Sequence, residues 1–541
     1  MAEVVTPQPP PPPPGVVDED IVKPYKIHIP SKHLDLTRQK LELTRLPHQG
    51  AEPQIEPLID YWLESYSFRE TETKLNETIT QFRTSIPLSP DSSSLGNNQS
   101  IRIHFIHSQS QSSSTSTSTP ILLLPPFPLT NLSIYPHIPS DPNQTLIIPS
   151  YPGIGFSDSL PASTSLVIKT TAHLFNELMI SRLNYTKYIV SVSSSNKIDN
   201  LIAQFLVSEY SDTCIGANLI NPELKKPSLG GGGNVWEWGK WLLARFFRGG
   251  VVGYEEEDFE QNMRNDHEEK GDVELGLGMG LGVPVEGNDG IGETISYALC
   301  DSPVGMLAAV VKGLGNREKK LGEEELVTIT NLGWLPGPEG AVRFGMGVCQ
   351  EGMGIKKKKK KGAVGVTVFV GGEKKGGYCP PAWANTEYIL CNTQRIKGGG
   401  GEGGLMLIFE RPEVIFDGVK GLVSGIEKLT ARKKEKEKET AAFEGVIIHP
   451  ATEQEVTTPP GQVIQPPVEL SAISSPASGD TAVAGTPSPS GGVDVKGKGK
   501  APVTTGDYLQ PPAPIRGDTV SSEGESPDTL VENLLPPLDK A

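Results

Sequence analysis

The sequence predicts an α/β fold with a mostly parallel central sheet. Short apolar runs such as ILLLP at 121–125 and KYIVSV at 187–192 are continuous rather than alternating, which is typical of parallel strands buried on both faces. Longer segments with helical spacing follow them, for example NLIAQFLVSEY at 200–210. Because short strands and helices alternate along the chain, we expect parallel strands joined by helices that cover both faces of the sheet.

The expected elements follow one another along 541 residues. Residues 24–86 have mainly helical spacing, and Leu58, Ile59 and Trp62 fall on one helical face. Apolar runs predict strands at 101–107, 121–125, 145–150, 187–192, 213–221, 363–370 and 386–391. Amphipathic segments predict helices at 164–185, 200–210, 235–247 and 411–429. The termini are rich in proline, serine and glycine without an apolar period, so we expect them to be disordered.

Composition narrows the possible classes of protein. The formal net charge of −16 argues against general binding of nucleic acid. The five cysteines have no spacing typical of a zinc site or a disulfide framework, which predicts free thiols and no metal or cofactor. The N-terminus lacks the basic start and apolar core of a signal peptide, and no window approaches the roughly 18 apolar residues of a transmembrane span. We therefore expect a cytoplasmic protein.

Four segments in collinear order carry a resemblance to a known family. They are PYKIHIPSKHLDLTRQKLELTRLP at 24–47, IPSYPGIGFSDSLP at 148–161, YALCDSPVGMLAAVV at 297–311 and ERPEVIFDGVKGL at 410–422. Together they resemble the microsomal-type epoxide hydrolases. The resemblance implies an α/β-hydrolase fold with a helical lid, an N-terminal helical extension and a small apolar or epoxide-like ligand.

The resemblance also implies domain boundaries. A proline-rich leader covers 1–22 and an epoxide hydrolase N-terminal-type domain covers 23–110. The α/β-hydrolase core covers 120–225 and 301–430, with a lid or insert at 226–300 between its halves. A disordered tail is expected at 431–541.

The family reaction proceeds through a covalent ester. An aspartate at a strand-to-helix corner attacks the epoxide, two lid tyrosines hold the epoxide oxygen, and a histidine oriented by a carboxylate activates the hydrolytic water. Alignment on the KY of the KYIVSV strand puts Ser194 at the aspartate position, with Ser193 and Asn196 at the flanking glycine positions. A serine would form an ether with the epoxide carbon, which is a dead end for hydrolysis.

The other catalytic positions are altered as well. Leu405 stands where the histidine belongs, and Glu373 is the candidate for the carboxylate, displaced by one residue. The resemblance implies an oxyanion loop whose backbone N–H groups bind the developing negative charge. In this sequence Pro125 and Pro126 stand in that loop, and proline has no N–H to donate. We find no base within reach of Ser194 by alignment.

The lid tyrosines are not found at their expected places. One position holds Gly345 and the other falls near Pro284, with Tyr254 and Tyr297 as the nearest alternatives. We expect Tyr297 to be packed rather than catalytic. The histidines that remain in the core, namely His104, His107 and His173, are interpreted as packed or surface side chains.

These losses favour one function and leave two others open. The first interpretation is a pseudoenzyme with a binding or regulatory role. The second is an active hydrolase with altered machinery, opening epoxides to diols or cleaving esters through Ser194. The third is a scaffold that recruits protein partners through proline-rich segments such as PPAPIRG at 511–517.

Overall fold

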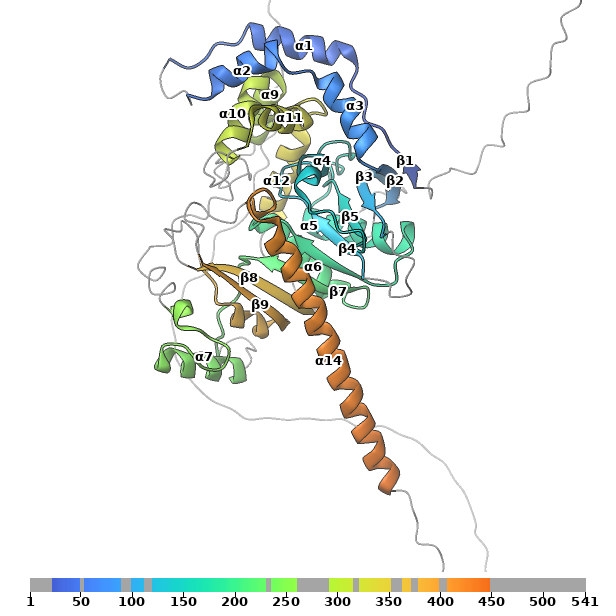
Figure 1. The fold of residues 1–541 in the computed structure, drawn as a ribbon, viewed down its shortest axis with the longest axis vertical. Coiled ribbons are helices and arrows are strands. Elements are labelled where there is room, and N and C mark those ends of the chain that lie inside the picture. Colours follow the sequence, from blue (N-terminus) through green and yellow to red (C-terminus); the bar gives the residue numbers. More distant parts are fainter. Residues whose placement is uncertain are drawn as a thin grey trace, which may run out of the picture. The chain divides into compact units, whose positions relative to one another are not determined.

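A computed structural model describes residues 22–48, 53–88, 99–110, 119–229, 235–259, 291–314, 321–351, 362–370, 378–397 and 406–447. Figure 1 shows the arrangement, with a central sheet flanked by helices. The described residues confirm the α/β class and the mostly parallel sheet. Glu373, Leu405 and Pro284 lie outside the described residues, as does the PPAPIRG segment.

The sheet has nine strands in the described part of the chain, in the order β1-β2-β3-β5-β4-β6-β7-β8-β9. The strands are β1 (Lys23–Pro24), β2 (Gln81–Pro87), β3 (Ser100–Ser108), β4 (Ile121–Leu124), β5 (Leu146–Pro149), β6 (Tyr188–Val192), β7 (Cys214–Ile220), β8 (Ala363–Val370) and β9 (Ile389–Lys397). The pairs from β5 through β9 are parallel, whereas β1, β2 and β3 add an antiparallel edge. All apolar runs interpreted as strands are therefore strands, although the last begins three residues later than expected.

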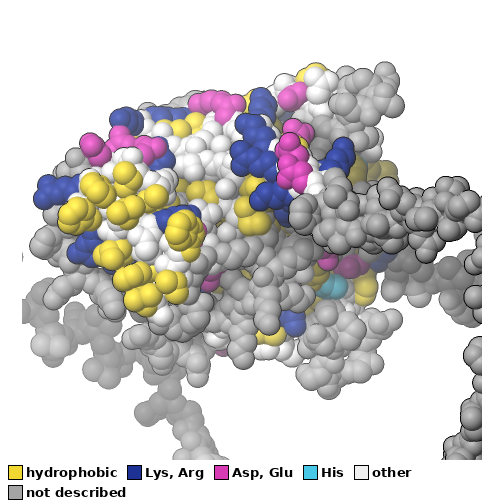
Figure 2. All heavy atoms as spheres, turned by 90° about the horizontal axis from the view of Figure 1, so that it is seen from below, with side chains coloured by type: hydrophobic (Ala, Val, Ile, Leu, Met, Phe, Trp, Pro, Cys, Tyr) yellow, Lys and Arg dark blue, Asp and Glu magenta, His cyan; other side chains and the backbone are white. Residues whose placement is uncertain are grey.

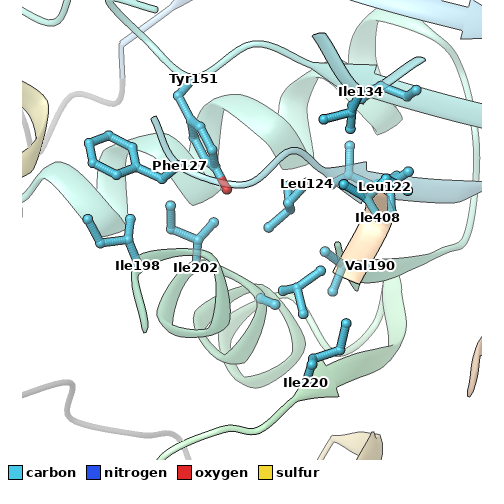
Figure 3. Packing of buried hydrophobic residues seen from close by; sticks show 14 of the residues in the cluster. Leu122, Leu124, Phe127, Ile134, Tyr151, Val190, Ile198, Ile202, Ile220 and Ile408 are labelled. Carbon is cyan, nitrogen blue, oxygen red and sulfur yellow. The ribbon is translucent and has the colours of Figure 1, made fainter. Parts of the chain in front are cut away.

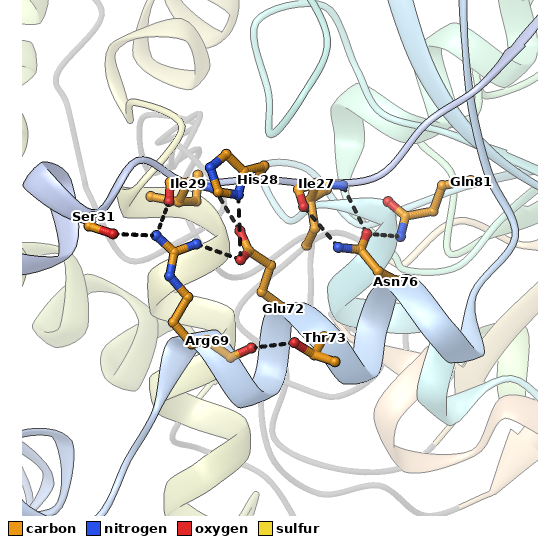
Figure 4. A network of polar contacts seen from close by, with 9 residues as sticks. All are labelled: Ile27, His28, Ile29, Ser31, Arg69, Glu72, Thr73, Asn76 and Gln81. Atoms are coloured by element: carbon orange, nitrogen blue, oxygen red, sulfur yellow. Dashed lines mark hydrogen bonds and ion pairs between the residues drawn. The ribbon is translucent and has the colours of Figure 1, made fainter.

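The N-terminal extension consists of α1 (Ser31–Glu42), α2 (Ile55–Glu64) and α3 (Phe68–Thr78). The expectation of a helical pattern as far as residue 86 is wrong, because QFRTSIP at 81–87 is strand β2 and pairs with β3. The residues before α1 run beside α3 and are held by its side chains (Figure 4). Asn76 accepts from the Ile27 N–H and donates to the Ile27 carbonyl at 2.8 Å each, and buried Glu72 accepts from the Ile29 N–H at 2.6 Å.

Helices cover both faces of the sheet. The core helices are α5 (Val167–Glu177), followed by a π turn at Leu178–Arg182, α6 (Lys197–Glu209), α13 (Leu407–Glu410) and α14 (Pro412–Ile447). One apolar core lies between the sheet and these helices, and Leu122, Val190, Ile202 and Ile408 contribute to it from four different elements (Figure 3). The short helix α4 (Asn131–Ile134) follows β4.

The helices between β7 and β8 form the lid. They are α7 (Val235–Phe247), α9 (Ile291–Asp301), α10 (Pro303–Leu314), α11 (Glu323–Trp334) and α12 (Glu339–Glu351), so the name lid is used here for helices that continue beyond the expected boundary at 300. A second apolar cluster joins α2 to α10 and α11 through Leu58, Leu307 and Val327, so the N-terminal extension is packed against the lid. Among the described helices no single one has the length and apolarity of a membrane span, and only the bent pair Gly292–Asp301 and Pro303–Leu314 reaches them together.

The last helix extends beyond the boundary at 431 that composition predicts. α14 continues to Ile447, and its residues 431–440 are exposed. The segment KKEKEKE supplies strong helix formers of alternating charge, which support a helix without any apolar face to bury. The apolar period ends before this segment, so apolar spacing alone does not predict its helix.

Candidate functional site

The strand-to-helix corner predicted from KYIVSV is present. Strand β6 ends at Val192, and α6 begins at Lys197 with the Asn196 side chain capping the Ile198 N–H at 2.8 Å. Ser194 lies in this corner and is fully buried. Its Oγ accepts from the Asn196 N–H at 3.1 Å and donates to Asp199 Oδ2 at 2.7 Å.

Asp199 is the residue of this site that alignment missed. It lies in the first turn of α6, is fully buried, and receives three kinds of donor. Tyr151 Oη donates to Oδ1 at 2.8 Å, the Phe127 N–H lies 3.2 and 3.3 Å from the two oxygens, and Ser194 completes the set. Burial raises the pKa of the Asp199 carboxyl to about 7, although the hydrogen bonds from Ser194, Tyr151 and Phe127 lower it.

The expectation that Ser194 has no base within reach is therefore wrong. Its hydroxyl is hydrogen-bonded to a carboxylate, and a pKa near neutrality is suited to a proton acceptor. The sequence did contain a signal: a charged residue in the first turn of a helix that is otherwise apolar toward the core. An acid at that place is also favoured by the N-terminal end of the helix dipole, so this signal alone does not indicate a functional role.

The loop that the resemblance identifies as the oxyanion loop has few free backbone N–H donors. Pro125 and Pro126 are buried and donate nothing, which leaves the N–H of Phe127. That N–H is directed at Asp199, so the protein's own carboxylate occupies the donor that an oxyanion would need. The Phe127–Pro128 peptide bond is cis.

Aromatic rings fill the space on the lid side of Asp199. Phe344 of lid helix α12 packs on Phe127 with ring centroids 5.4 Å apart and on Tyr151 at 5.6 Å. Figure 3 shows Phe127 and Tyr151 side by side above α6, with the Tyr151 hydroxyl directed into the core. Gly345, at the expected lid tyrosine position, is buried next to Phe344 in the chain and has no side chain to offer a ligand.

Glycines bring the lid into backbone contact with the core. A Cβ added to Gly340 at the start of α12 would lie 1.9 Å from the Gly153 carbonyl oxygen, and one added to Gly347 would lie 2.6 Å from the Val167 side chain. Beside this contact lies an apolar void of about 20 Å³. Its lining includes Pro128, Ile154, Leu299, Met306, Ala341 and Val342.

The region of the expected histidine does reach the corner. Ile408 donates its N–H to the Ser193 carbonyl at 3.1 Å, so the chain just after residue 405 is adjacent to Ser194. The described side chains here are apolar and buried from Met406 to Phe409. Both Leu405 and Glu373 stay predictions, because they lie outside the described residues.

The alternative tyrosines differ in their surroundings. Tyr254 is buried and packs near Phe259 with a centroid distance of 6.0 Å. Tyr297 is 79% exposed on α9, so the expectation that it is packed is wrong. Leu299, two residues later on the same helix, is the residue that faces inward.

The core histidines are buried at 104 and 107 and half-buried at 173, in agreement with the expectation of packed or surface side chains. His104 is fully buried with its Nε2 3.1 Å from Gln81 Oε1, and burial lowers the pKa of its imidazole to about 3. His107 Nε2 lies 2.9 Å from Tyr185 Oη, and His173 Nδ1 lies 3.4 Å from Tyr210 Oη. Across the described residues no group of three or more His, Cys, Asp or Glu side chains could hold a metal ion.

Comparisons with known proteins relate both the N-terminal sequence and the fold to epoxide hydrolases. Residues 22–134 match the family model described as "Epoxide hydrolase N terminus", which reaches beyond the boundary expected at 110. The fold resembles the crystal structure of juvenile hormone epoxide hydrolase from the silkworm Bombyx mori, with a TM-score of 0.55 and 20% identity over 76% of this chain and 95% of that one. It also resembles Aspergillus niger epoxide hydrolase, with a TM-score of 0.52 and 18% identity over 75% and 96%.

The chain therefore has an α/β-hydrolase fold, and its residues 22–134 are an epoxide hydrolase N-terminal segment. Among curated relatives, it is 26% identical to juvenile hormone epoxide hydrolase 1 of Ctenocephalides felis over 36% of this chain and 43% of the relative. It is 32% identical to juvenile hormone epoxide hydrolase of Bombyx mori over 25% and 28%. The aligned part thus spans less than half the length of these two curated relatives.

Proposed function

We propose that this epoxide hydrolase-like protein keeps the architecture without the epoxide-opening reaction and acts by binding. The observation that carries the proposal is the closed hydrogen-bonded unit of Ser194, Asp199, Tyr151 and the Phe127 N–H. Each donor that could serve a substrate is directed at the protein's own carboxylate. Ser194, Asp199 and Tyr151 are all fully buried.

The chemistry of the two candidate nucleophiles supports this reading. Ser194 would form an ether with an epoxide carbon, and water does not cleave that bond at useful rates. Asp199 has the carboxylate that the family reaction requires of a nucleophile, but both of its oxygens already accept hydrogen bonds. Phe127 and Phe344 pack together and against Tyr151 on the lid side of this unit.

The loss of a catalytic nucleophile or base lowers the rate of a hydrolase by a large factor. In a hydrolase such a loss lowers the rate by on the order of 10⁶. That factor corresponds to roughly 8 kcal/mol of transition-state stabilisation. Among the described residues, the unit around Asp199 contains no imidazole that could replace the lost base. The described core histidines are each hydrogen-bonded elsewhere.

The ligand proposed for the binding role is a small apolar or epoxide-like molecule. The void beside Pro128, Ile154 and Met306 is apolar, as such a ligand requires. Its volume of about 20 Å³ is close to the space of one water molecule. Ligand pockets usually enclose roughly 300–1,000 Å³, so binding requires α12 to move away from Gly153.

Incubation of the purified full chain with styrene oxide tests the loss of activity. We expect no diol above the uncatalysed reaction between pH 5 and 9. Diol formation that disappears in Asp199→Asn but persists in Asp301→Asn, a change of an exposed carboxylate, would contradict the proposal.

One observation favours a second function, the hydrolysis of esters through Ser194. The Ser194 hydroxyl is 2.7 Å from a carboxylate whose pKa is raised to about 7, which is the arrangement of a nucleophile and its base. A fluorophosphonate probe distinguishes the two functions. Labelling of wild type that is lost in both Ser194→Ala and Asp199→Asn supports ester hydrolysis, and absence of labelling supports the binding role.

The scaffold role and the cytoplasmic location stay predictions. Both proline-rich segments, at 1–22 and within 431–541, lie largely outside the described residues. Deleting 448–541 and comparing captured partners tests the scaffold role, since an unchanged set of partners argues against it. The deletion leaves α14 complete.

A further inference from the structure

Helix α7 (Val235–Phe247) presents a stripe of large apolar side chains to solvent. Its members are between 45% and 80% exposed: Val235, Trp236, Leu242, Leu243, Phe246 and Phe247. Pairs of them are three, four or seven residues apart, so they lie along one side of the helix, which we call the α7 stripe. Figure 2 shows apolar side chains gathered in a patch that is bordered by Lys and Arg side chains and, on its upper edge, also by Asp and Glu side chains.

The opposite side of α7 fixes the helix to the rest of the molecule. Ala244 is fully buried and Glu237 is 7% exposed, with an ion pair from Lys240 at 2.8 Å. Trp241 is partly buried against the main core. The stripe is therefore the outer face of an anchored helix, and single exposed apolar residues scattered on a surface would not give this pattern.

Basic side chains border the α7 stripe on both sides. Lys240 lies over the Trp236 ring at 5.6 Å, and Arg245 lies over the Trp241 ring at 5.4 Å. Lys226 is 4.8 Å from the Trp241 ring, and Arg248 follows the helix directly. The one acid within α7, Glu237, is buried and paired with Lys240, so the exposed cations beyond that pair are Arg245 and the following Arg248.

Of the four acids at 255–258, which follow α7 in the chain, three are paired with basic side chains and Glu256 is exposed. Glu255 and Asp258 are paired with Arg395 at 2.7 and 2.9 Å, and Glu257 is paired with Lys397 at 2.6 Å. A locally basic helix in a chain with a net charge of −16 is a strong departure from the average surface. It indicates an anionic partner for this face.

We propose that α7 binds the surface of lipid bilayers that contain anionic lipids. Trp, Phe and Leu side chains along one face enter the boundary between headgroups and acyl chains, while flanking Lys and Arg meet the phosphates. The stripe, its aromatic content and the cations on both edges fit this surface in one orientation, with α7 lying parallel to the membrane. This inference concerns a surface separate from the Asp199 site and does not depend on the proposed function.

Flotation of the full chain with vesicles tests the proposal. We expect binding to phosphatidylcholine vesicles that contain phosphatidylserine and much weaker binding to phosphatidylcholine alone. The variant Leu242→Glu/Phe246→Glu should lose binding, whereas the control Leu43→Glu, at a side chain 81% exposed on the N-terminal extension, should retain it. Arg245→Gln/Arg248→Gln should weaken binding by roughly fivefold for each arginine removed.

Three outcomes would overturn the proposal. The first is absence of flotation with either vesicle, and the second is equal binding with and without phosphatidylserine. The third is a wild-type protein that forms a dimer in solution and does not bind vesicles, while Leu242→Glu/Phe246→Glu is a monomer. In that case the stripe would be the contact with a second copy of this chain. Circular dichroism of each variant checks that α7 and the fold are retained.

Discussion

Replacing Asp199 by asparagine should change how the stability of the protein depends on pH. The pKa of this buried carboxyl is raised to about 7, compared with about 3.9 for an aspartate in an unfolded chain. Because the folded state holds the proton more tightly, the stabilising contribution is complete below pH 4 and is lost as the pH rises through 7.

The magnitude follows from the difference between the two pKa values. About three pH units at roughly 1.4 kcal/mol each give about 4 kcal/mol in full, of which roughly 2.5 kcal/mol is lost between pH 5 and pH 8. Asparagine fits the site, since its oxygen can keep the bonds from Tyr151 and Phe127 and its amide can donate to Ser194. We therefore expect Asp199→Asn to gain stability relative to wild type by that amount from pH 5 to pH 8.

Urea unfolding at several pH values measures this difference. Ser194→Ala is the matched control, because it removes a donor at the same site and keeps the carboxyl. The bond from Ser194 lowers the pKa of Asp199, so the control should lose at least as much stability with rising pH as wild type. A difference between wild type and Asp199→Asn that stays constant from pH 5 to pH 8 would refute the reasoning.

Other substitutions test the packing around the site. Gly340→Ala should cost about 1–3 kcal/mol in thermal unfolding through overpacking against Gly153, whereas the control Gly239→Ala, with nothing within 4 Å of the added Cβ, should be neutral or stabilising. Phe344→Ala should cost about 3–5 kcal/mol in urea unfolding, and a loss below 1 kcal/mol would show that α12 does not pack on the core. Asn76→Ala should cost about 1–3 kcal/mol by removing both bonds to Ile27, and unchanged melting would contradict the account of the N-terminal extension.

The fold was predictable where the sequence has continuous apolar runs. Strands β4 to β8 are rich in β-branched and aliphatic residues, and burial on both faces favours that composition. Strand β2 was missed because its polar and apolar residues are mixed in an edge region of the sheet. The extension of α14 to Ile447 was missed because helix propensity and charge pairing, not an apolar period, form that helix.

The site was only half predictable. Ser194 lies at the corner where the strand and helix patterns place it. Asp199 was not expected, because its role depends on Phe127 and Tyr151, which lie 72 and 48 residues earlier in the chain and meet it only in the folded core. Spacing along one chain segment does not carry that information.

Intact-protein mass spectrometry with an epoxide tests the central claim most directly. Covalent catalysis requires an ester between a protein carboxylate and the opened epoxide, and that ester adds the mass of the epoxide to the chain. Our account predicts that the mass of the full chain stays unchanged after incubation with styrene oxide. An adduct of that mass that maps to Asp199 and is released by water would contradict it.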